Sequence, residues 1–326
     1  MDGVILANKN GKEIRALDFD RYDIEVGTTD NTFQFEINRQ AYEELPQEAR
    51  IYIPGTEYGG LCRRLGTTTR DDEVRFGGYT WRGMMQKKII EPPAGADYAT
   101  DTGELNEIID ARVQAAFPGL FYGASDSTGV TVSWQYDRYC TMEEGLQKML
   151  RSVGYKLQIT YDNADRRVIV QAVQIEDYSE RIELSSDMRL NYVLDTQTDG
   201  VNHLILLGKG ELRDRTVRHL YINRAGNIVT AQYYTGIDEI AAVFDYAGAE
   251  LNDLVRQGKK KLRELANHDA FTMGIETDLD LGVGDIVGGR DYLTGVLMKA
   301  PIKSKVVKWE SGQRVIEYTL ENDADE

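Results

Sequence analysis

The segment that most looks like a ligand site is residues 281–291, LGVGDIVGGRD, which holds four glycines and two aspartates. A glycine-rich loop can bind a phosphate when it leads from a strand into a helix, because the helix N-terminus then faces the anion. Gly282 and Gly284 match the first two positions of this fingerprint, but Val287 takes the third and the next segments have the pattern of strands. We therefore expect no nucleotide or other cofactor here.

A calcium loop is the second interpretation of this region. Asp278, Asp280 and Gly282 have a suggestive spacing, but such a loop needs a bidentate carboxylate at its twelfth position, where this chain has Gly289. The sequence therefore predicts no metal site at these residues.

Turn chemistry in a β-structure is the third interpretation, and the one we adopt. It predicts a strand that places Leu279, Leu281 and Val283 on one face, a break at Gly284, and a turn over residues 288–291. Gly284 and at least one of the two glycines of that turn should adopt backbone angles that are costly for other residues.

Two other segments could contact phosphate or nucleic acid. GKGEL at 208–212 lies between two strand-like runs, whereas a P-loop needs Gly-Lys-Ser/Thr at the start of a helix. QGKKKLREL at 257–265 is the densest basic run, but Leu262 and Leu265 give it the pattern of an amphipathic helix with solvated lysines. The net charge of −16 and the pI near 4.8 also argue against a free-standing nucleic-acid binder.

The residues available for hydrolytic chemistry are few. The three histidines, His203, His219 and His268, form no zinc-binding spacing. A Ser-His-Asp hydrolase would need one of them, yet the chain has no G-x-S-x-G elbow, and Ser185 and Ser186 lie in an ordinary polar turn. We expect no catalytic triad.

Paired carboxylates such as Glu143–Glu144 and Asp278–Asp280 could in principle serve a glycosidase, whose two acids stand across a cleft. With 54 Asp and Glu residues such pairs arise by chance, and Glu144 already fits a helix-capping role. The sequence thus predicts a protein that is not an enzyme, with no catalytic, cofactor-binding or metal-binding residues.

The first ninety residues have the pattern of β-structure. An Asn-Gly pair at 10–11 between apolar runs predicts a hairpin, and TFQFEI at 32–37 alternates as a half-buried strand does. Residues 74–90 predict a strand or a bent strand pair, with the glycines at 77–78 at the bend or bulge. Two prolines at 92–93 end the segment.

The next stretch has an α/β pattern. One helix is predicted from Asp101 as N-cap to the Pro-Gly pair at 118–119. A second is predicted from a capping box formed by Thr141 and Glu144 to its terminator Gly154. Two strands follow, at 155–161 and 167–173.

The remainder is mostly β-structure with a helical interruption. Two strands are predicted around the glycines at 208–210, followed by a short helix at 237–246 and a longer amphipathic helix at 249–268. Strands return at 271–287, 295–309 and 314–320. The order β, α/β, β suggests two β-domains that flank an insertion.

The composition is that of a globular protein, with 41% hydrophobic and 28% charged residues. The N-terminal segment has only four consecutive apolar residues and no later run reaches 18, so we expect folding in the cytoplasm and no stable membrane association. Cys62 and Cys140 are too few for a disulfide framework and are expected to be buried small hydrophobes.

Several strings resemble the tail hub proteins of long-tailed bacteriophages and prophages, the family that forms the baseplate or tail-tip hub. Five strings carry the resemblance, and they lie at 81–98, 132–159, 199–223, 232–246 and 282–295. The first two read WRGMMQKKIIEPPAGADY and VSWQYDRYCTMEEGLQKMLRSVGYKLQI, and the last reads GVGDIVGGRDYLTG. They are spread over most of the chain, and their order matches the family's order of domains.

The resemblance implies an α+β, β-rich fold with two β-barrel-like domains that flank a small α/β domain. The first barrel would be residues 1–91, the α/β domain of two helices and a hairpin 92–174, and the second barrel 175–326, decorated by a helical insertion at about 237–267. It also implies a homotrimer, a ring in which six barrels face the hexameric tail tube.

The function implied is structural. Such a ring joins the tail tube or distal tail protein to a spike, fibre or lytic component, around a channel for tape-measure protein and DNA in transit. An acidic channel wall would repel that DNA. The expected location is the virion tail tip or baseplate after assembly in the host cytoplasm, with any wall-degrading activity on another polypeptide. The alternatives are a tail-associated cell-wall hydrolase or a carbohydrate-binding adhesin that uses some of the 19 tyrosines.

Overall fold

The computed structural model describes residues 3–27, 30–67, 72–179, 190–196, 199–266, 269–275, 280–290, 297–310 and 312–320. The chain forms two compact units. The first contains Met1–Asn191 together with Met273–Leu320, and the second is formed mainly by Tyr192–Thr272. The second unit is therefore inserted between two parts of the first.

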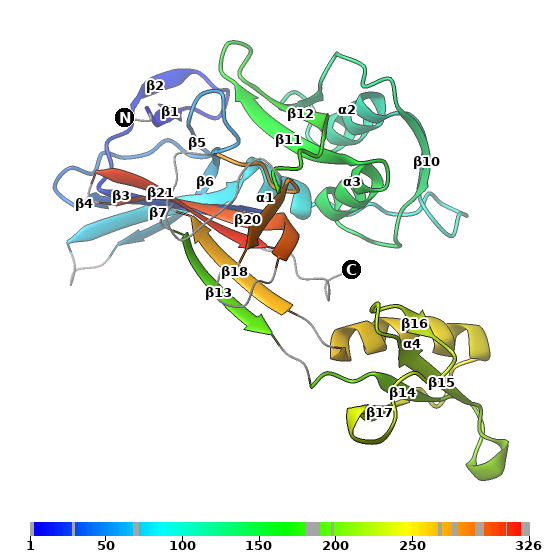
Figure 1. Ribbon diagram of the computed structural model, residues 1–326. Coiled ribbons are helices and arrows are strands. Elements are labelled where there is room, and N and C mark those ends of the chain that lie inside the picture. Colours follow the sequence, from blue (N-terminus) through cyan, green and yellow to red (C-terminus); the bar gives the residue numbers. More distant parts are fainter. Residues whose placement is uncertain are drawn as a thin grey trace. The chain divides into compact units, whose positions relative to one another are not determined.

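A curled sheet of 12 strands dominates the structure (Figure 1). Its strands are β1 (Ile5–Ala7), β2 (Glu13–Ala16), β3 (Arg21–Gly27), β4 (Thr32–Asn38), β5 (Arg50–Tyr52), β6 (Gly59–Thr67), β7 (Glu73–Thr80), β13 (Leu190–Thr196), β18 (Asp269–Ile275), β19 (Ile286–Arg290), β20 (Leu297–Glu310) and β21 (Gln313–Leu320). Their order is β13-β18-β21-β20-β3-β4-β7-β6-β5-β1-β2, with β19 paired to β20. The predicted β-rich class is thus confirmed.

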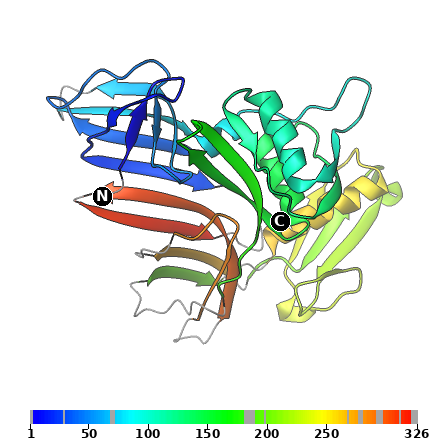
Figure 2. The same cartoon turned by 90° about the horizontal axis from the view of Figure 1, so that it is seen from above.

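Strands from the two ends of the chain meet within this sheet. β20 pairs antiparallel with β3, so that Lys305 is opposite Val26 and Trp309 is opposite Tyr22. Figure 2 shows these strands side by side, with the early strands in blue and β20 and β21 in orange and red. The first and the last β-regions of the sequence therefore share one hydrogen-bonded sheet.

Local signals account for several strands. The Asn-Gly pair forms the predicted β1–β2 hairpin, with Gly11 at φ +77°. In β4 the side chains of Phe33, Phe35 and Ile37 are buried and Gln34 is exposed, as the alternation predicts. Glu36 is buried as well, because its carboxylate forms ion pairs with two arginines of the neighbouring strands.

The segment that follows β6 differs from its prediction. β7 runs without a break through Gly77 and Gly78, and the bulge lies on the partner strand β6, between Cys62 and Arg64. The chain then forms helix α1 (Trp81–Gln86) in place of a predicted second strand. Thr80 caps this helix, since its hydroxyl accepts a hydrogen bond from the Gly83 amide at 3.2 Å.

Residues 81–174, which we call the α/β segment, continue the first unit. Helices α2 (Leu105–Ala116) and α3 (Met142–Arg151) pack on a small sheet in which β11 pairs antiparallel with β12 and β12 pairs parallel with β9. The strands are β8 (Thr100–Glu104), β9 (Phe121–Gly123), β10 (Thr131–Gln135), β11 (Tyr155–Asp162) and β12 (Arg167–Gln174). The predicted hairpin at 155–173 is confirmed.

One of the two predicted helix caps is correct. Thr141 caps α3 through a hydrogen bond from the Glu144 amide to its hydroxyl. The prediction of Asp101 as the cap of the other helix is wrong, because α2 begins at Leu105 with Glu104 as its N-cap. Asp101 lies in β8 instead, where its carboxylate binds the Arg112 guanidinium at 2.7 and 2.9 Å. That ion pair fixes the strand against the helix.

The second unit is a four-stranded sheet with one helix. The order is β16-β15-β14-β17. The elements are β14 (His203–Leu207), β15 (Val217–Ile222), β16 (Ile228–Val229), β17 (Ala241–Asp245), α4 (Leu251–Leu265) and the short 3₁₀ helices η2 (Leu212–Asp214) and η3 (Gly236–Asp238). Leu254 and Leu262 of α4 pack with Leu204, Leu206 and Leu220 in one buried core, so the predicted amphipathic helix is confirmed.

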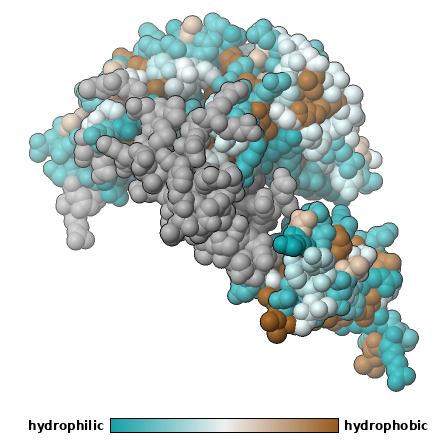
Figure 3. Space-filling model, in the orientation of Figure 1, coloured by the Kyte–Doolittle hydropathy of each residue, from teal (hydrophilic) through white to brown (hydrophobic). Residues whose placement is uncertain are grey.

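The short helix predicted at 237–246 is wrong. This segment forms η3 and the strand β17, which pairs parallel with β14 and turns Ala242 and Phe244 toward the core. Other large hydrophobic side chains of the unit face solvent: Leu212 is 94% and Ile237 98% exposed, and brown areas are visible on this unit in Figure 3. None of the described helices is long and apolar enough to cross a membrane.

Candidate functional site

The loop at 280–285 lies in the first unit and is largely buried. Leu281 and Val283 are buried, but they belong to a loop and not to the predicted strand. Gly284 turns the chain at φ +91°, as predicted, and its amide donates to the Ile302 carbonyl at 2.8 Å. Leu279 lies outside the described residues.

The turn predicted at 288–291 is wrong for its first three residues. Gly288 and Gly289 belong to β19, where they are opposite Lys299 and Met298 of β20. Backbone hydrogen bonding to β20 keeps this stretch extended, so only Gly284 bears out the prediction of unusual backbone angles. Asp291 lies outside the described residues.

Asp280, at the start of the loop, binds two side chains of the curled sheet and one from the loop that precedes β6. It accepts hydrogen bonds from the Tyr58 hydroxyl at 2.6 Å, the Lys305 ammonium at 2.8 Å and the Arg314 guanidinium at 3.0 Å. Burial opposes ionisation of this carboxyl group, but Lys305 and the other donors outweigh it and hold the pKa of Asp280 below its usual value. Asp280 is therefore an ionised anchor for the loop.

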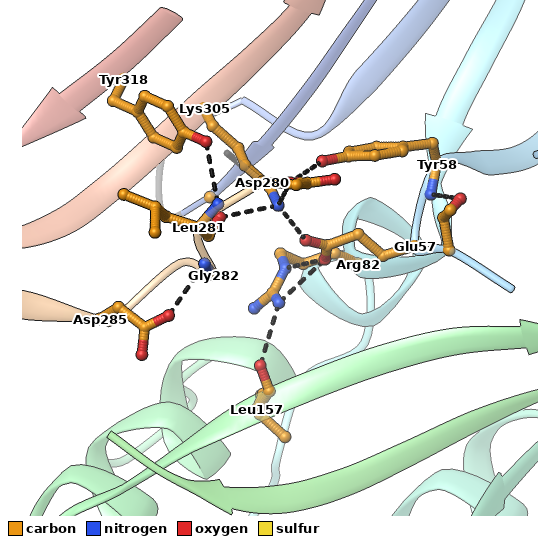
Figure 4. Close-up of polar contacts among 12 residues, drawn as sticks. Glu57, Tyr58, Arg82, Leu157, Asp280, Leu281, Gly282, Asp285, Lys305 and Tyr318 are labelled. Atoms are coloured by element: carbon orange, nitrogen blue, oxygen red, sulfur yellow. Dashed lines mark hydrogen bonds and ion pairs between the residues drawn. The ribbon is translucent and has the colours of Figure 1, made fainter. Parts of the chain in front are cut away.

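From Asp280 a row of alternating charges runs into the α/β segment (Figure 4). Lys305 lies 3.4 Å from Glu57, whose carboxylate accepts from Arg82 at 3.1 Å, and Arg82 reaches Glu143 of α3 at 3.3 Å. We call this set the charge chain. Its members are Glu143, Arg82, Glu57, Lys305, Asp280 and Arg314.

The charge chain joins elements that are distant in sequence. Arg82 comes from α1, Glu143 from α3, and Lys305 from β20. Arg82 also donates to the Leu157 carbonyl of β11 at 3.3 Å, and its side chain is only 2% exposed. A guanidinium that is buried this deeply costs several kcal/mol unless it is paired, so Arg82 needs an ionised carboxylate partner.

The two glutamates respond to burial in opposite ways. For Glu57, Arg82 and Lys305 outweigh the effect of burial, so the pKa of this carboxyl group is lowered. For Glu143, burial dominates and Arg82 only partly offsets it, so the pKa of Glu143 is raised. The ionised form is therefore favoured at Glu57 and disfavoured at Glu143.

Two buried tyrosines pack beside the charge chain and the loop. The Tyr58 ring has the Lys305 ammonium 5.1 Å and the Arg314 guanidinium 5.4 Å from its centre. The Tyr318 hydroxyl accepts a hydrogen bond from the Leu281 amide at 3.0 Å. Burial raises the pKa of Tyr318 to about 12 and also raises that of Tyr58. Both rings therefore stay neutral and act as hydrogen-bonding and packing groups.

A second ion pair holds the far end of the loop. Lys156 of β11 lies 2.5 Å from Asp285, whose carboxylate also accepts from the Gly282 and Glu176 amides at 2.9 Å each. A Cβ on Gly282 would lie closer than 3.0 Å to the Lys156 ammonium, so a larger residue here would make the Lys156 side chain shift.

A cavity of about 420 Å³ lies beside both ion-pair systems, and Glu57, Arg82, Lys156, Asp280, Asp285 and Lys305 are among its lining residues. The charge chain and the Lys156–Asp285 pair together contain four cations and four carboxylates, each with a partner. No group of three or more His, Cys, Asp and Glu side chains that could hold a metal is found among the described residues. The arrangement is suited to fixing the loop and the α/β segment on the curled sheet.

The structure places the other residues considered from sequence as follows. Glu143 is buried against Arg82, while Glu144 is exposed and pairs with Lys148. Asp278, Ser185, Ser186 and His268 lie outside the described residues. Lys259 and Lys260 are exposed on α4, Cys140 is buried and Cys62 is partly buried.

Sequence reasoning missed Glu57, Arg82 and Lys305, which carry the site. One signal was available, since Arg82 lies in a helix turn between Trp81 and Met85, two buried apolar residues. An arginine in that position must find a buried partner, but its identity depends on tertiary structure.

The opposite pKa shifts predict different effects of removing each carboxylate. Glu57→Gln should lower the free energy of unfolding by about 3 kcal/mol at pH 7, because it leaves Arg82 and Lys305 without their shared anion. Since the folded pKa of Glu57 is lowered, this stabilisation is present above the unfolded value of about 4.3 and is lost as the pH falls below it.

Glu143→Gln should change the free energy of unfolding by less than about 1 kcal/mol at pH 7. The folded pKa of Glu143 is raised, so its contribution is greatest at low pH and is lost as the pH rises through that value. Urea denaturation of both variants at pH 7 and pH 4 tests these two predictions. An equal loss of unfolding free energy in the two variants at pH 7 would contradict them.

We compared the chain with known proteins, and it is similar to several solved structures of tail proteins. No protein-family model matches the chain, and no curated protein matches it. Among solved structures, the chain is similar to a 43 kDa tail protein of prophage MuSo2 from Shewanella oneidensis, with a TM-score of 0.56 and 11% identity over 99% of this chain and 100% of that one.

Two further structures are similar over nearly their whole length. A prophage tail protein, gp18, from Listeria monocytogenes EGD-e has a TM-score of 0.52 and 13% identity over 98% of this chain and 94% of that one. A tail protein from Neisseria meningitidis MC58 has a TM-score of 0.50 and 14% identity over 98% and 96%. The chain therefore has the fold of these tail proteins, as the resemblance predicted.

Proposed function

We propose that this chain, which has the fold of phage and prophage tail proteins, is a structural hub of a phage or prophage tail. The observation that carries the proposal is that the similarity covers both partners almost completely, with 98–99% of this chain and 94–100% of the three solved tail proteins. The similarity therefore spans nearly the whole of each chain and is not confined to one domain.

In this proposal three copies form a ring that joins the tail tube or distal tail protein to a spike, fibre or lytic component. The division into two barrel-like domains around a small α/β domain belongs to the same proposal. Tape-measure protein and DNA would pass through the ring, and the net charge of −16 would keep DNA from adhering to its wall.

The geometry of the first unit favours a rigid structural protein over an enzyme. The charge chain links the α/β segment to both the early and the late strands of the curled sheet through buried contacts. Its carboxylates are bound to cations, and Glu143, which a hydrolase would need as an accessible acid, is only 3% exposed. Rigid coupling of this kind suits a protein that positions other tail components.

The oligomeric state tests this proposal directly. Native mass spectrometry of the full chain, alone and mixed with the tail-tube protein of the same phage or prophage, should show a species of three times 36.8 kDa in at least the mixture. A chain that stays monomeric in both samples would overturn the ring. Clearing of a cell-wall zymogram, lost in Glu143→Gln, would favour the hydrolase instead.

A further inference from the structure

Two of the chain's three histidines meet on the second unit, in a way that their spacing in sequence conceals. His203 lies on β14 and His219 on β15, and antiparallel pairing places them diagonally opposite each other. His203 Nε2 is 2.8 Å from His219 Nδ1. Leu204, Leu206 and Leu220 fill the core under α4, so the alternation of both strands turns the two histidines to the opposite face of the sheet.

The Glu239 carboxylate determines which nitrogen of the His203 ring carries a proton. His203 Nδ1 lies 2.6 Å from Glu239 Oε1, and an ionised carboxylate can only accept, so Nδ1 carries the proton. In the neutral ring, Nε2 of His203 then has the lone pair and faces His219 Nδ1. The Tyr221 ring, stacked 4.3 Å from the His203 ring, keeps it from rotating.

These features correspond to the carboxylate–histidine–metal arrangement of protein metal sites, in which an outer carboxylate orients a ligand imidazole. Glu239 occupies that outer position, because its oxygen binds the ring nitrogen that faces away from His219. His203 is 8% exposed and held rigidly, whereas His219 is exposed, so a metal and its water ligands can enter from solvent.

We propose that His203 Nε2 and His219 Nδ1 chelate one divalent transition-metal ion of the zinc, nickel or copper class, with Glu239 as a positioning residue and water completing the coordination. Imidazole pairs suit these ions. Metal–nitrogen bonds of about 2.0–2.1 Å in a tetrahedral site need the two nitrogens roughly 3.3 Å apart. A small rotation of the exposed His219 ring provides this, with its proton moving to Nε2. The ion would pin β14 to β15, and the proposal does not depend on the tail function.

Isothermal titration of the untagged full chain with ZnCl₂ tests the proposal. One ion should bind per chain, and His219→Gln should abolish this saturable binding while leaving the fold intact, because glutamine can still donate a hydrogen bond to His203. Glu239→Gln should weaken the affinity roughly 10- to 100-fold, the usual effect of losing an outer carboxylate.

His268→Gln serves as the matched control, since it removes the remaining histidine and should leave the affinity unchanged. Long-range ¹H–¹⁵N spectra of the histidine rings should show zinc on His203 Nε2 and His219 Nδ1. The absence of saturable zinc binding, or binding that survives His219→Gln, would overturn the site. If the Glu239→Gln variant binds zinc with unchanged affinity, Glu239 is not a positioning residue for the site.

Discussion

Replacing Gly77 with alanine should destabilise the first unit by at least about 3 kcal/mol, at the upper end of the effect of overfilling a packed site. A Cβ at this position would lie closer than 3.0 Å to the Phe33 carbonyl oxygen of β4. That oxygen belongs to the backbone of a central strand, so it cannot move aside without breaking the β4–β7 pairing. The cost is a large part of the 5–15 kcal/mol that stabilises a typical domain.

Gly66 offers a matched control in the same sheet. It lies in β6, and a Cβ there would meet nothing closer than the Arg75 carbonyl oxygen at 4.0 Å. Gly66→Ala should therefore change stability by less than about 1 kcal/mol. All three tryptophans, Trp81, Trp134 and Trp309, belong to the first unit, so tryptophan fluorescence excited selectively at long wavelength reports the denaturation of this unit alone. Similar midpoints for the two variants would refute the steric explanation.

Arg82→Met should lower the free energy of unfolding of the first unit by about 3–5 kcal/mol at pH 7. Methionine fills a similar apolar volume, but Glu57 and Glu143 would lose the guanidinium that lies between them, and the Leu157 carbonyl would lose its donor. A carboxylate left buried without a cation is far more costly than the loss of one exposed contact.

The exposed pair of Arg63 and Glu48 provides the comparison. Its members are 61% and 53% exposed at a distance of 3.1 Å, so Arg63→Met should cost no more than about 1 kcal/mol. Adding Glu143→Gln to Arg82→Met should recover part of the loss, because it removes one unpaired carboxylate. An Arg82→Met variant as stable as Arg63→Met would show that the charge chain does not hold the α/β segment in place.

Elements with strong local signals were predictable from sequence. The alternation of Phe33, Phe35 and Ile37 identifies β4, and the Thr141 cap with its apolar stripe identifies α3. The amphipathic pattern of 251–265 likewise identifies α4. Each of these signals lies within a single turn, strand or helix, so it can be read without knowledge of the neighbours.

Elements whose state depends on neighbours were predicted wrongly. The pattern of 237–246 predicts a helix, but 241–245 forms the strand β17 because β14 supplies a parallel partner. Helix α1 has only six residues, too few for a clear periodic pattern. Gly288 and Gly289 look like turn residues by type, yet pairing with β20 makes them strand residues.

The sequence by itself therefore determined the β-rich class, the local hairpins and longer helices, and the resemblance to tail hub proteins. Only the tertiary structure decided that β20 lies beside β3, that Arg82 is held between Glu57 and Glu143, and that His203 faces His219. The physical reason is that propensity and capping act over a few residues. Strand pairing and buried ion pairs, in contrast, join groups whose separation along the chain carries no information about their distance in space.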